Sequence, residues 1–136
     1  GGSARIPTRL EVGFVARVEN THLWERYAKL RSSMLQLAKG PDLKIPPHKP
    51  TPLSTRSWEA AGLPQPELFS PLNEFLFFHG TSPSAADSIA NEGFRIAYAG
   101  KHGGSMYGAG IYASESCTKA DEYSHDEWLR AHRHRG

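Results

Sequence analysis

The apolar positions near the start of the chain change from a two-residue period to a helical one. Between Glu11 and Glu19, apolar and polar residues alternate, which predicts a half-buried strand with Val12, Phe14, Ala16 and Val18 on one side. After Asn20-Thr21, which are good N-cap residues, apolar side chains recur at steps of four and three: Leu23, Tyr27, Leu30, Met34 and Leu37. This spacing predicts a helix with one core-facing stripe, which Gly40-Pro41 ends.

Proline dominates the next stretch of the chain. Residues 41–71 hold eight of the ten prolines, and the segment 46–52 fits neither a helix interior nor a central strand. We expect a loop or linker there, with one helical turn over 57–62 that Ser57 caps and Gly62 stops. Two interpretations stay open, a long surface insertion and a polyproline ligand for a signalling domain.

The second half of the chain alternates short elements with glycines. An aromatic-rich strand is predicted over 75–79, ending at Gly80-Thr81. Ser82 is then expected to cap a short helix with Pro83 in its first position and Gly93 at its end. The apolar face of this helix consists of Ala86, Ile89 and Ala90.

A glycine-rich loop precedes the last predicted elements. Glycines at positions 100, 103, 104, 108 and 110 lead into a short strand over 110–113. Ser116 is a candidate cap for a last helix, which carries Ala120 and Tyr123 and continues towards Trp128.

The composition is that of one small domain or part of one. The chain has 136 residues, of which 38% are hydrophobic, and domains typically run to about 100–200 residues. A net charge of +2 gives no support to direct nucleic-acid binding, and no apolar run approaches the about 20 residues of a membrane span. The single cysteine, Cys117, favours a reducing intracellular compartment, nuclear or cytoplasmic. Residues 1–10 are interpreted as a linker or a remnant of cloning.

His79-Gly80-Thr81 is the first candidate for chemistry. A histidine at the end of a buried strand presents its ring to a loop face while its backbone stays fixed. Gly80 lacks a side chain, so a ligand can approach its backbone N–H and C=O, which match the acceptor and donor of a carboxamide. The alternative for His79 is a structural histidine whose hydrogen bonds are satisfied within the fold.

The glycines between positions 104 and 110 do not form a common nucleotide motif. No Lys-Ser or Lys-Thr pair follows them as in a P-loop, and the strand comes after the glycines, whereas a dinucleotide fold has it before them. Tyr112 and Tyr123 lie eleven positions apart on a predicted strand and the helix after it, so the pair is a candidate sandwich for a flat ring. Plain core packing is the alternative for these tyrosines.

Several blocks in this order resemble the catalytic domain of the poly(ADP-ribose) polymerase family. The blocks are 77–81, Ile89 with Gly93-Phe94, 107–112 and 119–124, preceded by Val18-Glu19-Asn20 with Leu23, Trp24 and Tyr27. The likeness covers about residues 12–38 and 75–124. Residues 11–136 are therefore expected to form a partial catalytic domain with a proline-rich insertion at 41–71.

The resemblance implies an α+β fold, with a split antiparallel sheet and flanking helices around an NAD cleft. It implies cleavage of the nicotinamide–ribose bond of NAD, the co-substrate, and transfer of ADP-ribose to an acceptor that is expected to be a protein side chain. No metal is expected. This reaction passes through an oxocarbenium-like state, which orientation and nearby negative charge stabilise. An inactive module that binds NAD, ADP-ribose or a protein surface is the main alternative, and a docking ligand within Pro41–Pro71 is another.

Family position also implies roles for single residues. His79 would hold a ribose hydroxyl, the Gly80 backbone would pair with the nicotinamide carboxamide, and Thr81 would contact the adenosine-side ribose. Tyr112 and Tyr123 would enclose the nicotinamide ring. Lys119 is either an entrance residue that contacts the acceptor or phosphate, or a solvated lysine.

Two departures from the family pattern concern binding and catalysis. Ala120 stands where many members have a serine that bonds the carboxamide, and one such neutral hydrogen bond is worth roughly 0.5–1.5 kcal/mol. The family's third catalytic residue, usually a glutamate on a late strand, has no counterpart up to Gly136, and Glu115, Glu122 and Glu127 lie in other contexts. We therefore expect little or no transfer from these 136 residues alone.

Overall fold

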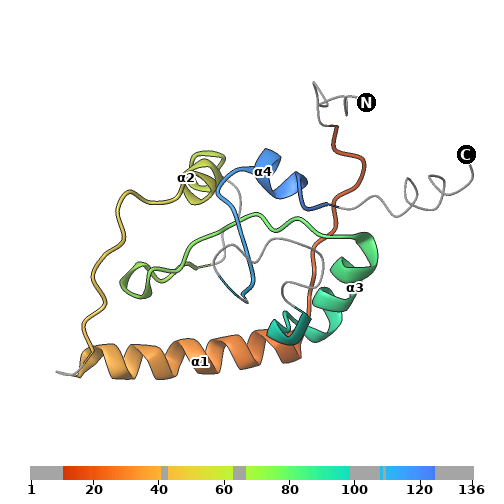
Figure 1. Cartoon of the computed structure of the whole chain (residues 1–136). Helices are drawn as coiled ribbons and strands as arrows, with labels where there is room; N and C mark the ends of the chain where they lie inside the picture. The colour runs from red at the N-terminus through yellow and green to blue at the C-terminus, as the bar shows by residue number, and fades with distance from the viewer. Residues whose placement is uncertain (1–10, 41–42, 63–66, 99–107, 109, 125–136) are drawn as a thin grey trace, which may run out of the picture.

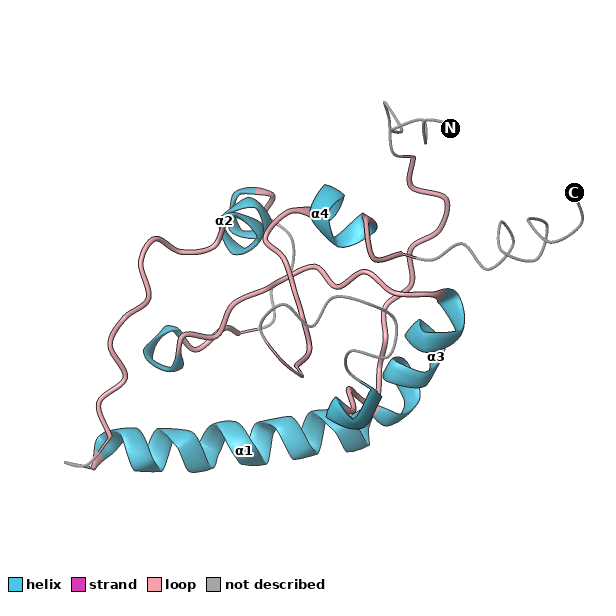
Figure 2. Cartoon of the chain, in the orientation of Figure 1, coloured by secondary structure: helices cyan, strands magenta, loops and turns pink. Residues whose placement is uncertain are grey.

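The computed structural model describes residues 11–40, 43–62, 67–98, 108 and 110–124. Its helices are α1 (Thr21–Lys39), α2 (Leu53–Ala60), α3 (Pro83–Glu92) and α4 (Cys117–Asp121), with 3₁₀ turns η1 (Ser70–Leu72) and η2 (Ile96–Tyr98). Helix α1 runs along one side of the molecule, α2 and α4 lie on the opposite side, and α3 lies near the start of α1 (Figure 1). The segments between the helices are extended loops (Figure 2).

The predicted strand over 11–19 is wrong. This segment is extended, but among the described residues no backbone hydrogen bond joins residues 12–19 to another segment. Val12 and Phe14 are 82% and 86% exposed, so the alternating pattern has no sheet to pack against. A strand requires a partner, and the local pattern of a sequence does not provide one.

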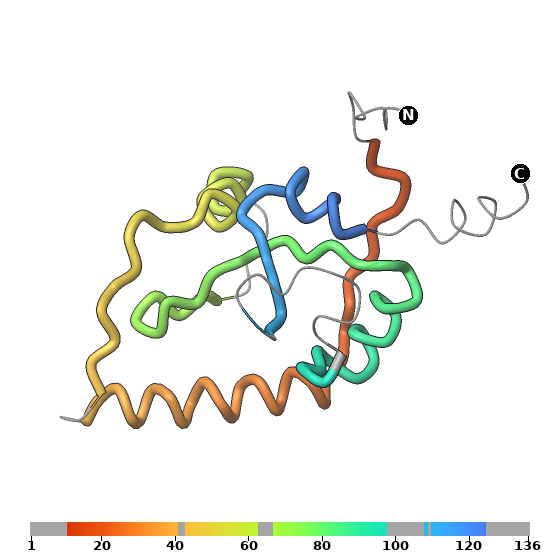
Figure 3. The backbone as a smooth tube through the Cα atoms, viewed as in Figure 1, coloured from red at the N-terminus to blue at the C-terminus, as the bar shows by residue number. Residues whose placement is uncertain are grey.

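The predicted strands over 75–79 and 110–113 are reduced to one antiparallel bridge. Phe78 and Ser114 exchange both backbone hydrogen bonds, at N–O distances of 2.8 and 2.9 Å. We call the extended segments 75–79 and 110–115 the two arms of the bridge. In the tube view, these arms cross near the middle of the molecule (Figure 3). The split antiparallel sheet is therefore unconfirmed in the part of the chain that the structure describes.

Helix α1 is confirmed together with its caps. The Asn20 side chain accepts a hydrogen bond from the Leu23 N–H at 3.0 Å, and the Gly40 N–H donates to the Leu37 carbonyl. The expected core-facing stripe is wrong, because Leu30 and Leu37 are about 60% exposed. The half-buried side chains form a neighbouring stripe instead: Leu23, Ala28, Arg31, Leu35 and Ala38.

Helix α3 is also confirmed, with Ser82 as cap, Pro83 in the first turn and Gly93 at the end. Gly93 has a φ of 82°, which explains the glycine at this C-cap. The Asn20 amide donates to the carbonyls of Ala90 and Asn91, both at 3.0 Å. One side chain thus caps α1 and ties it to the end of α3.

A polar cluster holds α1 against the segment around η1. The Tyr27 hydroxyl and Arg31 both contact the Glu74 carboxylate, which also accepts from the Phe69 N–H at 2.6 Å. Arg31 donates in addition to the Glu67 carbonyl at 3.2 Å. Partial burial and the Glu74 carboxylate raise the pKa of Tyr27 from 10.0 to about 12.

Helix α2 begins four residues earlier than the predicted turn. Pro52 occupies its N-cap position, and the Glu115 carboxylate accepts from the Leu53 N–H at 2.6 Å, so the cap comes from a residue far away in the sequence. Ser57 lies inside the helix, and Gly62 follows it with a φ of 62°. The prediction of helical structure here is thus confirmed, but its predicted start is wrong.

The proline-rich segment before α2 is attached to the rest of the chain. Asn73 has a left-handed backbone with a φ of 53°, and its side chain accepts from the His48 N–H and donates to the Pro46 carbonyl. Five described residues are buried: Pro52, Ser54, Thr55, Leu72 and Ala120. Three of these lie at the start of α2, so this stretch contributes most of the buried centre of the described residues.

Candidate active site

The bridge between Phe78 and Ser114 brings His79 beside Tyr112. The Nδ1–H of His79 donates to the Tyr112 carbonyl at 2.8 Å, and the imidazole and Phe94 rings form a T-shaped contact with a centroid distance of 4.9 Å and an interplanar angle of 87°. These two contacts fix the ring. In the neutral tautomer that makes this bond, Nε2 is an acceptor suited to a hydroxyl.

Gly80 packs directly on the backbone of α4. A Cβ at this position would lie 1.7 Å from the Ala120 carbonyl oxygen, so no side chain fits. Among the described residues, neither the N–H nor the C=O of Gly80 takes part in a hydrogen bond. The absence of a side chain therefore allows α4 to approach the turn, and the sequence did not indicate this role of Gly80. Both peptide groups of Gly80 are left for a ligand.

An open pocket of about 300 Å³ lies between this turn and α4. Its volume is at the lower end of the roughly 300–1,000 Å³ typical of ligand sites. The candidate residues His79, Gly80 and Ala120 line it together with Glu11, Phe78, Cys117, Asp121 and Ser124. The structure thus brings together three of the six candidate residues at one pocket.

The other three candidates lie outside the lining of this pocket. Tyr112 contributes its carbonyl to His79, while its hydroxyl donates to the Gly108 carbonyl at 2.6 Å. Thr81 is half-buried beside Gly80. Tyr123 follows α4, and the Lys119 ammonium lies over its ring at 5.7 Å from the centroid.

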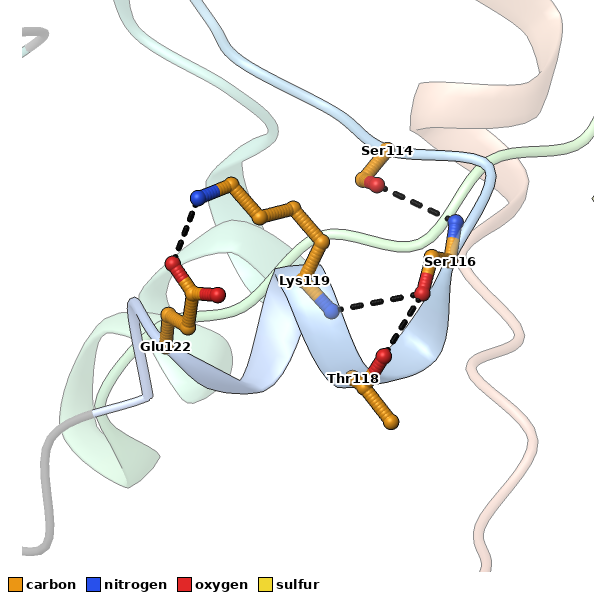
Figure 4. A network of polar contacts seen from close by, with 5 residues as sticks. All are labelled: Ser114, Ser116, Thr118, Lys119 and Glu122. Atoms are coloured by element: carbon orange, nitrogen blue, oxygen red, sulfur yellow. Dashed lines mark hydrogen bonds and ion pairs between the residues drawn. The ribbon is translucent and has the colours of Figure 1, made fainter. Parts of the chain in front are cut away.

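A network of polar side chains organises the start of α4 (Figure 4). Ser116 caps the helix as predicted, accepting from the Lys119 N–H, and its own N–H donates to the Ser114 hydroxyl at 3.1 Å. Lys119 pairs with Glu122, which raises the pKa of this lysine through a hydrogen bond and an opposite charge. Lys119 is therefore an exposed lysine held by an ion pair over Tyr123.

Two of the glutamates that the sequence left unassigned have structural partners. Glu115 caps α2 and Glu122 binds Lys119, whereas Glu127 lies outside the described residues. Sequence reasoning missed Glu11 and Asp121, the two carboxylates that line the pocket. The position of Asp121 directly after Ala120 was an available signal, but nothing in the sequence placed Glu11 near His79.

The comparison with protein families matches this chain to a catalytic-domain model. The model of the poly(ADP-ribose) polymerase catalytic domain covers residues 2–133. The chain belongs to this family. No curated protein and no solved structure gives a significant match.

Membership of the poly(ADP-ribose) polymerase family confirms the resemblance and implies the ADP-ribosyltransferase fold, with NAD as the family's substrate. Within the described residues, no three histidine, cysteine or carboxylate side chains are grouped so that they could hold a metal ion. A search of the same residues finds no helix with the length and hydrophobicity needed to cross a membrane.

Proposed function

We propose that this chain carries the NAD-binding part of an ADP-ribosyltransferase, which cleaves the nicotinamide–ribose bond and transfers ADP-ribose to a protein side chain. The observation that carries the proposal is the turn at His79-Gly80. It joins a fixed imidazole and two unpaired peptide groups at the edge of a pocket, in a member of the poly(ADP-ribose) polymerase family.

The residues of the turn fit the parts of NAD that they would hold. The N–H and C=O of Gly80 complement the oxygen and amino group of the nicotinamide carboxamide. Nε2 of His79 would accept a hydrogen bond from a ribose hydroxyl, while Nδ1 stays bonded to Tyr112. Thr81, as the next residue, would contact the adenosine-side ribose. With Ala120 in place of a serine, the carboxamide receives one hydrogen bond fewer.

A ring sandwich by Tyr112 and Tyr123 requires a local rearrangement. The Lys119 ammonium covers one face of Tyr123 in this structure, and Glu122 holds it there. An exposed ion pair contributes little stability, so stacking of the nicotinamide ring can displace it. Lys119 would then lie at the entrance, where it can contact phosphate or the acceptor.

An inactive NAD-binding module of the same fold is the second candidate. The specific observation in its favour is that Glu115 and Glu122 are both engaged elsewhere, so neither supplies negative charge next to the ribose. Glu11 and Asp121 line the pocket and are the carboxylates from which such charge would come in the described residues.

Labelled NAD tests the transfer reaction directly in the full-length protein, that is, these 136 residues together with any that flank them in the natural protein. We expect transfer of labelled ADP-ribose in the wild type, and loss of at least about tenfold in His79→Ala, because one positioned binding group is removed. Ser57→Ala, an exposed change on α2, serves as the control. Thermal stabilisation by NAD without transfer would support the binding module, and unchanged transfer in His79→Ala would contradict the site.

A further inference from the structure

The first turn of α2 holds the arm that ends at His79. Thr55 is only 2% exposed, and its hydroxyl accepts from the Leu76 N–H at 2.9 Å and also lies within hydrogen-bond distance of the Leu76 carbonyl. The Ser54 hydroxyl donates to the same carbonyl. These two hydroxyls thus take the place of a neighbouring strand for Leu76, three residues before His79.

The same turn also holds the other arm. Glu115, three residues after Tyr112, accepts from the Leu53 N–H at 2.6 Å. A carboxylate at a helix N-terminus is stabilised by the unpaired N–H groups and the helix dipole. Three consecutive residues of α2 therefore bond to both arms. Ser54 and Thr55 bond to the backbone of Leu76, and the Leu53 N–H donates to Glu115.

The two arms share little backbone pairing in the part of the chain that the structure describes. Among the described residues, their only backbone pairing is the bridge between Phe78 and Ser114, and a single pair of strands is at best marginally stable in water. A shift of one residue in either arm would separate His79 Nδ1 from the Tyr112 carbonyl, which are 2.8 Å apart. The anchors on α2 are placed where they prevent such a shift.

We infer that Thr55 and Glu115 are positioning residues of the site, which act through α2 to set the register of the two arms and thereby the orientation of His79. The proline-rich stretch is then a support for the site. The catalytic consequence rests on the proposed function, whereas the orientation of His79 can be measured without it.

The first test removes the Thr55 hydroxyl while keeping the shape of the side chain. In full-length Thr55→Val, we expect faster hydrogen exchange at the Leu76 amide and a change in the ¹⁵N shifts of the His79 ring, which report its tautomer. We expect kcat/KM for NAD to fall about tenfold, as for a misplaced binding group. Thr55→Ser, which retains the hydroxyl, should restore all three, and Ser57→Ala should change none.

The second test removes the other anchor. Glu115→Ala should give the same change in the His79 ring shifts, while Glu115→Gln, whose amide oxygen still accepts a hydrogen bond, should retain most of the wild-type signal. Glu59→Ala, which removes an exposed carboxylate from the same helix, is the control. Because Thr55 binds the arm that leads to His79 and Glu115 belongs to the other arm, agreement between the two tests would not follow from damage to one local contact.

The inference and the proposed function fail in different ways. Unchanged His79 shifts in both Thr55→Val and Glu115→Ala would overturn the positioning role, whatever the activity. A kcat/KM loss that only matches the unfolded fraction seen by circular dichroism, with no rescue by Thr55→Ser, would overturn it as well. If both variants alter the His79 shifts and the wild type transfers no ADP-ribose, the positioning role is retained and the proposed enzyme is contradicted.

Discussion

The predicted apolar stripe of α1, which includes Leu30 and Leu37 and is called its outer face below, differs from the first turn of α2 in both chemistry and burial. Helix α1 carries the more regular apolar pattern, yet Leu30 and Leu37 on that stripe are largely exposed. Helix α2 lies in a proline-rich stretch, and its Ser54 and Thr55 are buried and bonded to a backbone segment about twenty residues away. In the described residues, polar side chains that bond to backbone determine packing more than apolar stripes do.

This difference has a physical basis. An apolar stripe favours burial against any apolar surface and does not select its partner. A buried hydroxyl must find a hydrogen-bond partner, and a missed one costs about 1–3 kcal/mol, so it selects one position of its neighbour. We therefore expect changes near α2 and α4 to be costly, and changes on the outer face of α1 to be tolerated.

The largest effect is expected for Gly80→Ala, on the α2 and α4 side. The added methyl group would lie 1.7 Å from the Ala120 carbonyl oxygen, so α4 must move. We expect a loss of about 3 kcal/mol in the free energy of unfolding, measured by urea denaturation. Gly13→Ala is the control, because its methyl group meets nothing within 4 Å. Equal stability of the two variants would show that α4 does not pack on Gly80.

A pair of leucine truncations compares the buried centre with the outer face of α1. Leu72, in η1, is 9% exposed, and Leu72→Ala should cost about 2 kcal/mol, because a buried leucine leaves a cavity. Leu37→Ala on α1 should cost less than about 0.5 kcal/mol, since its side chain is already exposed. Thermal unfolding of both variants measures the difference. A larger loss for Leu37→Ala would mean that the outer face of α1 is covered in solution.

Asn20 tests a place where α1 is joined to α3. Asn20→Ala removes both the cap and the bonds to the carbonyls of Ala90 and Asn91, and we expect a cost of about 1–2 kcal/mol. Asn20→Ser keeps a capping oxygen and loses the bonds to α3, so it should lie between Ala and the wild type. If Asn20→Ser is as stable as the wild type, the bonds to α3 contribute nothing.

The smallest effect is a pH dependence at Tyr27. Its pKa is raised from 10.0 to about 12, so the folded state holds this proton more tightly than the unfolded state. The stabilisation is fully present below pH 10 and is lost as the pH rises through 12. Because Tyr27 is partly exposed, we expect a modest fall, measured by urea denaturation between pH 9 and 12. Tyr27→Phe should remove this part of the dependence, and an unchanged slope would contradict the contact with Glu74.

The predictable parts of the fold are those with local signals. Asn20, Ser82 and Ser116 cap the helices that their sequence positions indicate, because a capping side chain bonds to N–H groups two or three residues away. The start of α2 was misplaced because its cap is Glu115, sixty-two residues from Leu53. The strand over 11–19 failed for a similar reason, since pairing depends on segments far away in the sequence.

The site was predictable only as far as its motifs reach. The strand-end motif indicated His79 and Gly80, the family resemblance added Ala120, and these three residues line one pocket in the structure. The hydrogen bond between His79 and the Tyr112 carbonyl involves a backbone atom, which no residue type reveals. Glu11 lines the pocket because of the path of the extended segment before α1. The sequence did not predict this path, because the alternation of apolar and polar residues over 11–19 indicated a paired strand.

The position of Cys117 offers an experimental route to the pocket. It is the only cysteine in the sequence, it is exposed, and it lines the same pocket as His79 and Gly80. A thiol-reactive fluorophore would therefore label the natural sequence of these 136 residues at one atom, without mutagenesis. Its emission would report whether NAD, nicotinamide or an acceptor peptide occupies the pocket. The rate of labelling with each of them present would show which one leaves Cys117 accessible.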